Sequence, residues 1–309
     1  MFAAHDPRVQ VHVDEELLPH ATRRPMSHTL RLLWFVPFPL AVTAEVLKLT
    51  PSVALKAGRN PSSDAQFEAL MAGQADAVVT AMDNVMDWNL RQGPRDFRVI
   101  AQLERTTPLT LVGRKGRARL RDLCGATILV DAPRNGFIVA LRAMLAEEGL
   151  GPDAYALEPV GGVQERYDAM LAGRGDATLL GPPFDAMALK AGLSRIATVQ
   201  ERYPAFPGQG LVVSAGALQR LRPALSTWLR GLEGARKRMS KDPEQARQAP
   251  TLAGFSALAV DSMLLATPAS LYPDRAGIEL LIEQRRSSGL PGADTTYEKL
   301  VEASALPEG

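Results

Sequence analysis

A segment of this chain occurs twice, one hundred residues apart, and it limits the folds that the chain can adopt. Residues 67–77 read FEALMAGQADA, and residues 167–177 read YDAMLAGRGDA. Each copy predicts a helix, a glycine that ends it, an aspartate, and an apolar strand at 77–80 or 177–180. A period this long does not fit a solenoid, which stacks several short units. It predicts two α/β lobes of one design, with a cleft between them where a small ligand binds.

The strictly conserved positions of the repeat are few, and their pattern indicates a structural role. The positions identical in register are Ala69/Ala169, Ala72/Ala172, Gly73/Gly173, Asp76/Asp176 and Ala77/Ala177. Asp76 and Asp176 look like a pair of catalytic carboxylates, but their shared Gly-x-x-Asp context is typical of a turn before a strand. We therefore expect them in separate lobes, each with a structural role.

Composition excludes several classes of function. The chain has 309 residues, enough for two packed domains, and its 35 basic and 34 acidic side chains give a net charge of +1, which argues against nucleic-acid binding. Its single cysteine, Cys124, rules out an intramolecular disulfide and a cysteine-rich zinc site. The histidines are His5, His12, His20 and His28. The body thus lacks the imidazole of a Ser-His-Asp triad or a histidine metal site, and we predict no catalytic residue, metal or cofactor.

The order of expected elements predicts βαβ units and largely parallel sheets. Strands are expected at 30–36, 52–57, 77–80, 126–130, 155–160 and 177–180, and helices at 41–49, 63–71, 137–148, 164–171 and 218–240. Crossovers between the lobes are expected near 112–115 and 203–211, which are rich in glycine, proline or charge. The region after the second crossover has no partner in the repeat, so we expect it to pack on the first lobe.

These boundaries give a domain layout. Residues 1–28 are expected to be a flexible N-terminal extension, with the true start at Met1 or Met26. Residues 29–112 and 205–309 form lobe 1, and residues 113–204 form lobe 2. Residues 30–44 could pass for a short secretory segment, but Pro37 and Pro39 interrupt it, and we favour a core strand followed by a ligand loop. No stretch is long and apolar enough to span a bilayer.

The candidate site follows from the rule that ligands bind beyond the carboxyl ends of parallel strands. The rule selects Phe38, Arg59, Asn60, Ser62, Ser63, Thr80, Asp83, Asn84, Arg134, Asn135, Gly136, Pro182 and Pro183. Gln209 is added because it lies between two glycines at the return crossover, where its side chain could reach the cleft.

Two chemistries remain open for these residues. The helix starts near Ser63 and Gly136 have free backbone N–H groups that favour an anion, and Arg134 could add a bidentate clamp for a sulfonate or carboxylate. Alternatively, Ser63 forms a capping box with Gln66, Arg134 faces water, and 135–136 is an ordinary turn. Residues 83–84 could recognise an amino group or simply cap the helix that follows.

Several segments together resemble a known family. They are the helix-stop motif EALMAGxxDA with TAMDNV at 80–85, VDAPRNGF at 130–137, VGG at 160–162 and LGPPF at 180–184. Over residues 29–290 the chain resembles bacterial ABC-transporter solute-binding proteins of the nitrate/sulfonate/taurine type, a group that includes thiamin-pyrimidine synthase-like proteins. The resemblance implies an α/β, two-lobed type II periplasmic-binding-protein-like fold, with two mostly parallel sheets flanked by helices and a hinge between the lobes.

The resemblance also implies a function and partners. The expected function is to close two lobes on a small organic anion, such as a sulfonate, carboxylate or aromatic acid, for uptake through an ABC permease or for reading by a sensor. The family implies a periplasmic location, whereas the absence of a clear signal peptide favours the cytoplasm. That departure keeps an alternative open, a cytoplasmic decarboxylase, dehydratase or hydrolase on the same fold.

Overall fold

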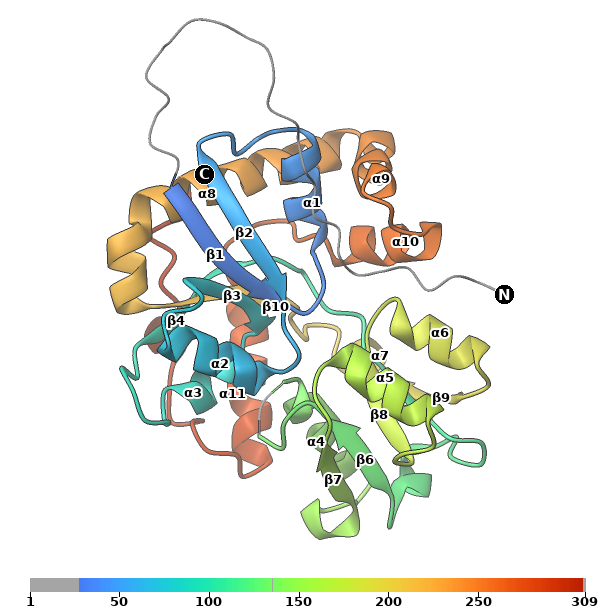
Figure 1. Ribbon diagram of the computed structural model, residues 1–309. Helices are drawn as coiled ribbons and strands as arrows, with labels where there is room; N and C mark the ends of the chain where they lie inside the picture. The colour runs from blue at the N-terminus through green and yellow to red at the C-terminus, as the bar shows by residue number, and fades with distance from the viewer. Residues whose placement is uncertain (1–27, 135, 308–309) are drawn as a thin grey trace, which may run out of the picture.

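The chain forms two lobes, each built on a five-stranded sheet (Figure 1). The computed structural model describes residues 28–134 and 136–307. The first sheet has the spatial order β2 (Val53–Arg59), β1 (His28–Trp34), β3 (Ala77–Ala81), β10 (Gln209–Ser214) and β4 (Phe97–Gln102). The second has the order β7 (Ala156–Pro159), β6 (Thr127–Val130), β8 (Ala177–Leu180), β5 (Thr110–Gly113) and β9 (Ser194–Thr198). This architecture confirms the α/β two-lobed prediction.

Both sheets are mixed in the same way, because each contains one antiparallel strand. β1 is parallel to β2 and β3, and β6 is parallel to β7 and β8. The antiparallel strand is β10 in the first sheet and β5 in the second. Each of these strands enters its sheet directly after the chain has crossed from the other lobe. The two crossovers lie side by side, because the Leu103 N–H donates to the Gln209 carbonyl at 2.9 Å and the Gly208 N–H donates to the Arg105 carbonyl at 3.2 Å.

The position of β5 corrects one expected boundary. Thr110–Gly113 pairs with β8 and β9, so the first crossover lies between β4 and β5 and not near 112–115. The chain returns between α7 (Val199–Arg202) and β10, inside the expected segment 203–211. His28 is the first residue of β1, and the rest of the expected extension, residues 1–27, lies outside the described residues. We keep the remaining domain limits as a proposal.

The two repeat aspartates have the same structural role in their own lobes. The backbone N–H of Asp76 donates to the carbonyl of Arg31 at 2.9 Å, and its carboxylate accepts the Arg31 backbone N–H at 3.0 Å. Asp176 does the same with Thr127, at 2.7 and 2.8 Å. Each aspartate thus ties the start of one parallel strand to its neighbour. The glycine three positions earlier has a positive φ, 64° in one copy and 95° in the other, a conformation that glycine adopts without strain.

Helices cover both faces of each sheet. The first lobe carries α1 (Pro39–Val46), α2 (Ser63–Met71), α3 (Asn84–Trp88), α8 (Ala215–Lys241), α9 (Pro243–Leu252), α10 (Ala257–Ala266) and α12 (Tyr297–Leu300). The second carries α4 (Ile138–Glu147), α5 (Val163–Leu171), α6 (Phe184–Lys190), α7 and the short 3₁₀ helices Leu120–Leu123 and Pro152–Ala154. α1 and α8 pack together over one face of the first sheet, around Phe38 and Trp228. None of the helices in the described part of the chain combines the length and apolar character that crossing a bilayer requires.

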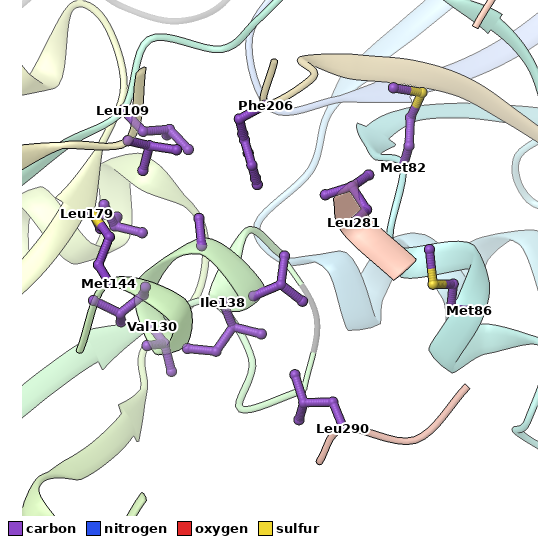
Figure 2. Packing of buried hydrophobic residues seen from close by; sticks show 14 of the residues in the cluster. Met82, Met86, Leu109, Val130, Ile138, Met144, Leu179, Phe206, Leu281 and Leu290 are labelled. Atoms are coloured by element: carbon purple, nitrogen blue, oxygen red, sulfur yellow. The ribbon is translucent and has the colours of Figure 1, made fainter. Parts of the chain in front are cut away.

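One C-terminal helix connects the lobes. α8, α9 and α12 pack on the first lobe, as expected for the unrepeated region, but α11 (Arg275–Ser287) also packs against α4 of the second. Met82 and Leu281 of the first lobe therefore belong to the same buried apolar cluster as Ile138 and Met144 of the second (Figure 2). Apolar burial thus holds the two lobes together on this side.

Candidate ligand-binding cleft

A cavity of about 110 Å³ lies between the lobes, at the carboxyl ends of their parallel strands. The first lobe contributes the loop after β1 and the residues that follow β3. The second lobe contributes the loops after β6 and β8 and the start of α5. The residues that carry its chemistry are Thr80, Asn84, Glu104, Asp131, Arg166 and Gln209, and its apolar wall includes Phe35, Val36, Pro37, Phe137, Pro182 and Met263. An adjacent space of about 230 Å³ shares part of the apolar wall. The first is called the inner cavity and the second the outer space.

The sequence-predicted residues divide into two groups by position. Thr80, Asn84, Gly136, Pro182 and Gln209 line the inner cavity, and Arg59 and Pro183 line the outer space. Phe38, Asn60, Ser62, Ser63, Asp83 and Arg134 line neither. Asn135 lies outside the described residues.

Phe38 and Asn60 are buried away from the cleft. The Phe38 ring is 1% exposed and packs edge-on against Trp34 and Trp228, with ring centres 6.0 and 6.2 Å apart. Asn60 is 2% exposed, and its side-chain amide donates to the Ser62 carbonyl. Both residues follow a strand end, as the strand-end rule requires, but their side chains point back into the first lobe.

The two serines have separate roles, which corrects the expected capping box. Ser62 is the N-cap of α2, and its hydroxyl accepts the Ala65 N–H at 3.1 Å. Ser63 is the first helical residue, and its backbone N–H donates to both carboxylate oxygens of Asp131 at 3.2 Å. Gln66 does not complete a box, because its side-chain amide donates to the Val79 carbonyl at 3.0 Å. The positive end of α2 thus faces an acidic side chain of the other lobe.

Asp83 and Arg134 belong to a buried ionic cluster beneath the cleft. Asp83 is fully buried and contacts Arg285 of α11 at 3.2 Å. Burial raises the pKa of the Asp83 carboxyl to about 6, although the Arg285 charge opposes the shift. Arg134 reaches across from the second lobe to Asp87, with 3.3 Å between Nε and Oδ1, and its side chain is 57% exposed. Both side chains hold parts of the protein together and do not reach the cavity.

Two lining residues absent from the sequence candidates carry much of its charge. Asp131 directly follows β6, and the strand-end rule applied to the first residue of that loop would have found it. Burial raises the pKa of the Asp131 carboxyl, with Arg166 opposing. Arg166 is in register with Gln66 when the repeat is extended by one residue. Both side chains donate to the strand carbonyl below them, and Arg166 reaches that of Leu179 at 3.1 Å.

Glu104 is the third charged side chain in the lining, and no repeat or motif points to it. It follows β4 at the first crossover and is 9% exposed. Its carboxylate accepts the hydroxyl of Thr107 at 2.5 Å and the side-chain amide of Gln209 at 3.2 Å. Burial raises the pKa of the Glu104 carboxyl despite these bonds. Glu104, which lies in the first crossover, thus holds the Gln209 side chain at the cleft.

Polar contacts between the lobes surround the cavity. The Gly136 N–H donates to the Asn84 side-chain oxygen at 2.7 Å, and the Gly162 N–H donates to the Pro61 carbonyl at 2.6 Å. Near the mouth, Arg59 of the first lobe forms an ion pair with Glu165 of the second. These contacts join the two lobes around the cavity. Within the described residues, no group of three or more His, Cys, Asp or Glu side chains is placed to hold a metal ion.

The chain was compared with protein families, curated proteins and solved structures. The family model described as "NMT1/THI5 like" matches residues 52–246. The search of curated proteins found no match. The periplasmic nitrate-binding protein NrtA from Synechocystis PCC 6803 has a similar structure, with a TM-score of 0.75, 10% identity, and coverage of 92% of this chain and 88% of that chain.

Two further solved structures have the same fold. The alkanesulfonate-binding protein SsuA from Xanthomonas axonopodis pv. citri, bound to MOPS, has a TM-score of 0.69 at 17% identity and covers 93% of this chain and 100% of its own. The Candida albicans CA3427 gene product, described as having the generic periplasmic binding protein fold, has a TM-score of 0.72 at 10% identity, with 91% and 98% covered. At these identities the likeness concerns the fold.

Proposed function

Because the chain belongs to the NMT1/THI5-like family, we propose that it is the solute-binding component of an ABC-type import system. Its lobes close on a small organic molecule in the inner cavity, and the closed form is presented to a membrane permease. The observation that carries this proposal is the cavity itself, which is lined from both lobes and bordered by hydrogen bonds between them. Neighbouring structures that bind nitrate or alkanesulfonate support the same role.

The ligand class is open within this proposal. An organic anion, such as a sulfonate, carboxylate or aromatic acid, is the ligand that the nitrate- and sulfonate-binding neighbours suggest. Arg166 is the cationic side chain in the lining that would hold it. The comparisons give no support to the enzyme alternative.

Gly162 offers a direct test of lobe closure. A Cβ built on Gly162 would lie 3.1 Å from the Phe35 ring and 3.1 Å from the Pro61 carbonyl, both in the first lobe. Its φ of −62° suits any residue. Within its own lobe the Cβ would meet the Glu165 carboxylate, at 2.9 Å, and that flexible side chain can move aside, so the main obstacle is the approach of the other lobe. Gly151 has nearly the same backbone, with φ −69° and ψ 173°, and nothing within 4 Å of a Cβ. It is a matched control.

The experiment compares Gly162→Val and Gly151→Val with the wild type. Each protein is unfolded, washed free of bound solute, refolded, and mixed with the small-molecule fraction of yeast extract. We expect that fraction to raise the melting temperature and reduce the radius of gyration of the wild type and of Gly151→Val. Gly162→Val should show neither change, because its lobes cannot meet. Closure of Gly162→Val as complete as that of the control would contradict the proposal.

A further inference from the structure

The inner cavity has more acidic than basic side chains in its lining. Its described lining contains two carboxylates, Glu104 and Asp131, and one cation, Arg166. Asp131 and Arg166 are on the second lobe, whereas Glu104 is on the first, so closure brings the three groups to one space. With all three ionised the lining has a net charge of −1. A cavity built to hold an anion by charge would show the opposite balance.

Arg166 is already engaged by its own lobe. Its two terminal nitrogens donate to the carbonyls of Gly161, at 2.6 Å, and Leu179, at 3.1 Å. Its charge is also offset by the carboxylates of Asp131 and Glu165. A bidentate clamp on a sulfonate or carboxylate needs two parallel N–H groups that are free to point at the ligand. The guanidinium of Arg166 instead fixes the turn before α5 to strand β8.

Asp131, in contrast, retains capacity to accept hydrogen bonds. Asp131 is 9% exposed, and both of its carboxylate oxygens accept from one donor, the backbone N–H of Ser63. An ionised carboxylate has about four acceptor positions. Asn84, by comparison, is used in both directions, because it donates to the Thr80 hydroxyl and accepts from Gly136. Asp131 is therefore a negatively charged acceptor in this lining that can take further hydrogen bonds.

The rest of the enclosure is apolar. Phe35, Pro37, Val163 and Met263 line both the inner cavity and the outer space. The rings of Phe184 and Phe255 and the side chain of Arg59 also line the outer space. Such walls suit a flat or aliphatic body that extends from the polar end of the cavity towards the mouth.

Accepting that the protein is a solute-binding component, we propose that its ligand is a neutral or cationic organic molecule with N–H donors. The donors, as in an amide, amidine or amine, face Asp131 and Glu104, and the apolar body lies along the wall from Phe35 to Met263. A charge-assisted hydrogen bond to a buried carboxylate is stronger than one between neutral groups. An anion at the same place would face two like charges in a medium of low dielectric constant.

Charge-sorted fractions test this inference without knowledge of the ligand. Solute-free protein is mixed separately with the cationic, neutral and anionic fractions of yeast extract, obtained on ion-exchange resins at pH 7. We expect the cationic or the neutral fraction to raise the melting temperature. Stabilisation by the anionic fraction alone overturns the inference and leaves the proposed function intact. Absence of stabilisation by every fraction contradicts the proposed function itself, and with it the inference.

Matched variants then locate the contact. Asp131→Asn keeps the shape and still accepts the Ser63 N–H, but it removes the charge, so the affinity for the stabilising fraction should fall about 10- to 100-fold. Asp153→Asn, on the exposed surface of the second lobe, should leave it unchanged. Because Asp131→Asn leaves the buried Arg166 with only Glu165 as an opposing charge, its ligand-free melting temperature is measured as well, and the affinities are compared at a temperature where every variant is folded. Unchanged or higher affinity in Asp131→Asn, with the fold intact, overturns the inference.

Discussion

One difference between the two repeat units lies at the cleft, at the helix position just before the repeated segment. Gln66 and Arg166 occupy equivalent places on α2 and α5, and each donates to the carbonyl of the strand beneath, Val79 or Leu179. Gln66 is 0% exposed and absent from the cavity lining, whereas Arg166 lines the cavity and faces Asp131. The shared bond maintains the frame of each lobe, and the charge at this position lies in the cavity lining of the second lobe only.

The end of the third strand of each unit and the start of the helix after it also differ between the lobes. In the first lobe Thr80 lies at the end of β3 and Asn84 begins α3, and both are buried and hydrogen-bonded to each other. The corresponding second-lobe positions are Leu180 and Phe184, and Pro182 lies between them on the cavity wall. One lobe thus contributes polar groups after its strand and the other an apolar surface. The repeat shows where the site lies, and the departures from the repeat show its chemistry.

The largest expected effect comes from removing the charge of Arg166, which Gln66 lacks in the first lobe. Arg166→Met should lower the free energy of unfolding by about 3 kcal/mol, because it leaves the buried Asp131 without its opposing charge. Gln66→Met breaks one neutral hydrogen bond and should cost about 1 kcal/mol. Urea unfolding monitored by circular dichroism measures both. Equal losses in the two variants would mean that Arg166 is only a frame residue, as Gln66 is.

A smaller difference is expected between the two repeat aspartates. The Asp76 side chain is 6% exposed and accepts three N–H groups of Arg31, whereas that of Asp176 is 32% exposed and contacts Arg117 only at 3.8 Å. Asp76→Asn should therefore cost about 2 kcal/mol, and Asp176→Asn about 1 kcal/mol or less. Urea unfolding at pH 7 compares them, and a greater loss from Asp176→Asn would contradict the structural ranking.

The same aspartate predicts a pH dependence. Burial opposes ionisation of Asp76, but the hydrogen bonds and charge of Arg31 outweigh it and lower the pKa of the carboxyl in the folded state. A lowered pKa contributes stability above the ordinary aspartate pKa of about 4, and that contribution is lost as the pH falls through the folded-state value. The difference in stability between the wild type and Asp76→Asn should thus shrink between pH 6 and pH 3. A difference that stays constant over this range would exclude Asp76 as its source.

The sequence predicted the lobes well because their signals are local. A helix, a glycine with positive φ and an aspartate before a strand are all read from adjacent residues, and the two copies confirm each other. The boundary at β5 was wrong because Thr110–Gly113 joins the second sheet through partners far along the chain, β8 and β9. Glycine, proline and charge near 112–115 indicate a turn, but they do not say in which sheet the preceding strand lies.

The candidate site was harder to predict because side-chain direction depends on packing. The strand-end rule located Thr80, Asn84 and Pro182 in the lining, but it also selected Phe38, whose ring turns into the core. It passed over Asp131, the first residue after β6. Glu104 could not have been found from the sequence, because its place at the cleft is set by the crossover and by its bond to Gln209.

The smallest expected effect concerns a contact between the lobes that has no repeat counterpart. Asp87 of α3 corresponds to Met187 of α6, so only the first lobe offers a carboxylate there, and Arg134 of the second lobe pairs with it. Arg134→Ala should lower the affinity for the stabilising fraction by about two- to fivefold, the range for an exposed ion pair. The half-point of thermal stabilisation measures the change, with Arg119→Ala, an exposed arginine of the same lobe, as control. A loss near a hundredfold would instead place the Arg134 guanidinium on the ligand, and would require the second lobe to reorient its loop when solute binds.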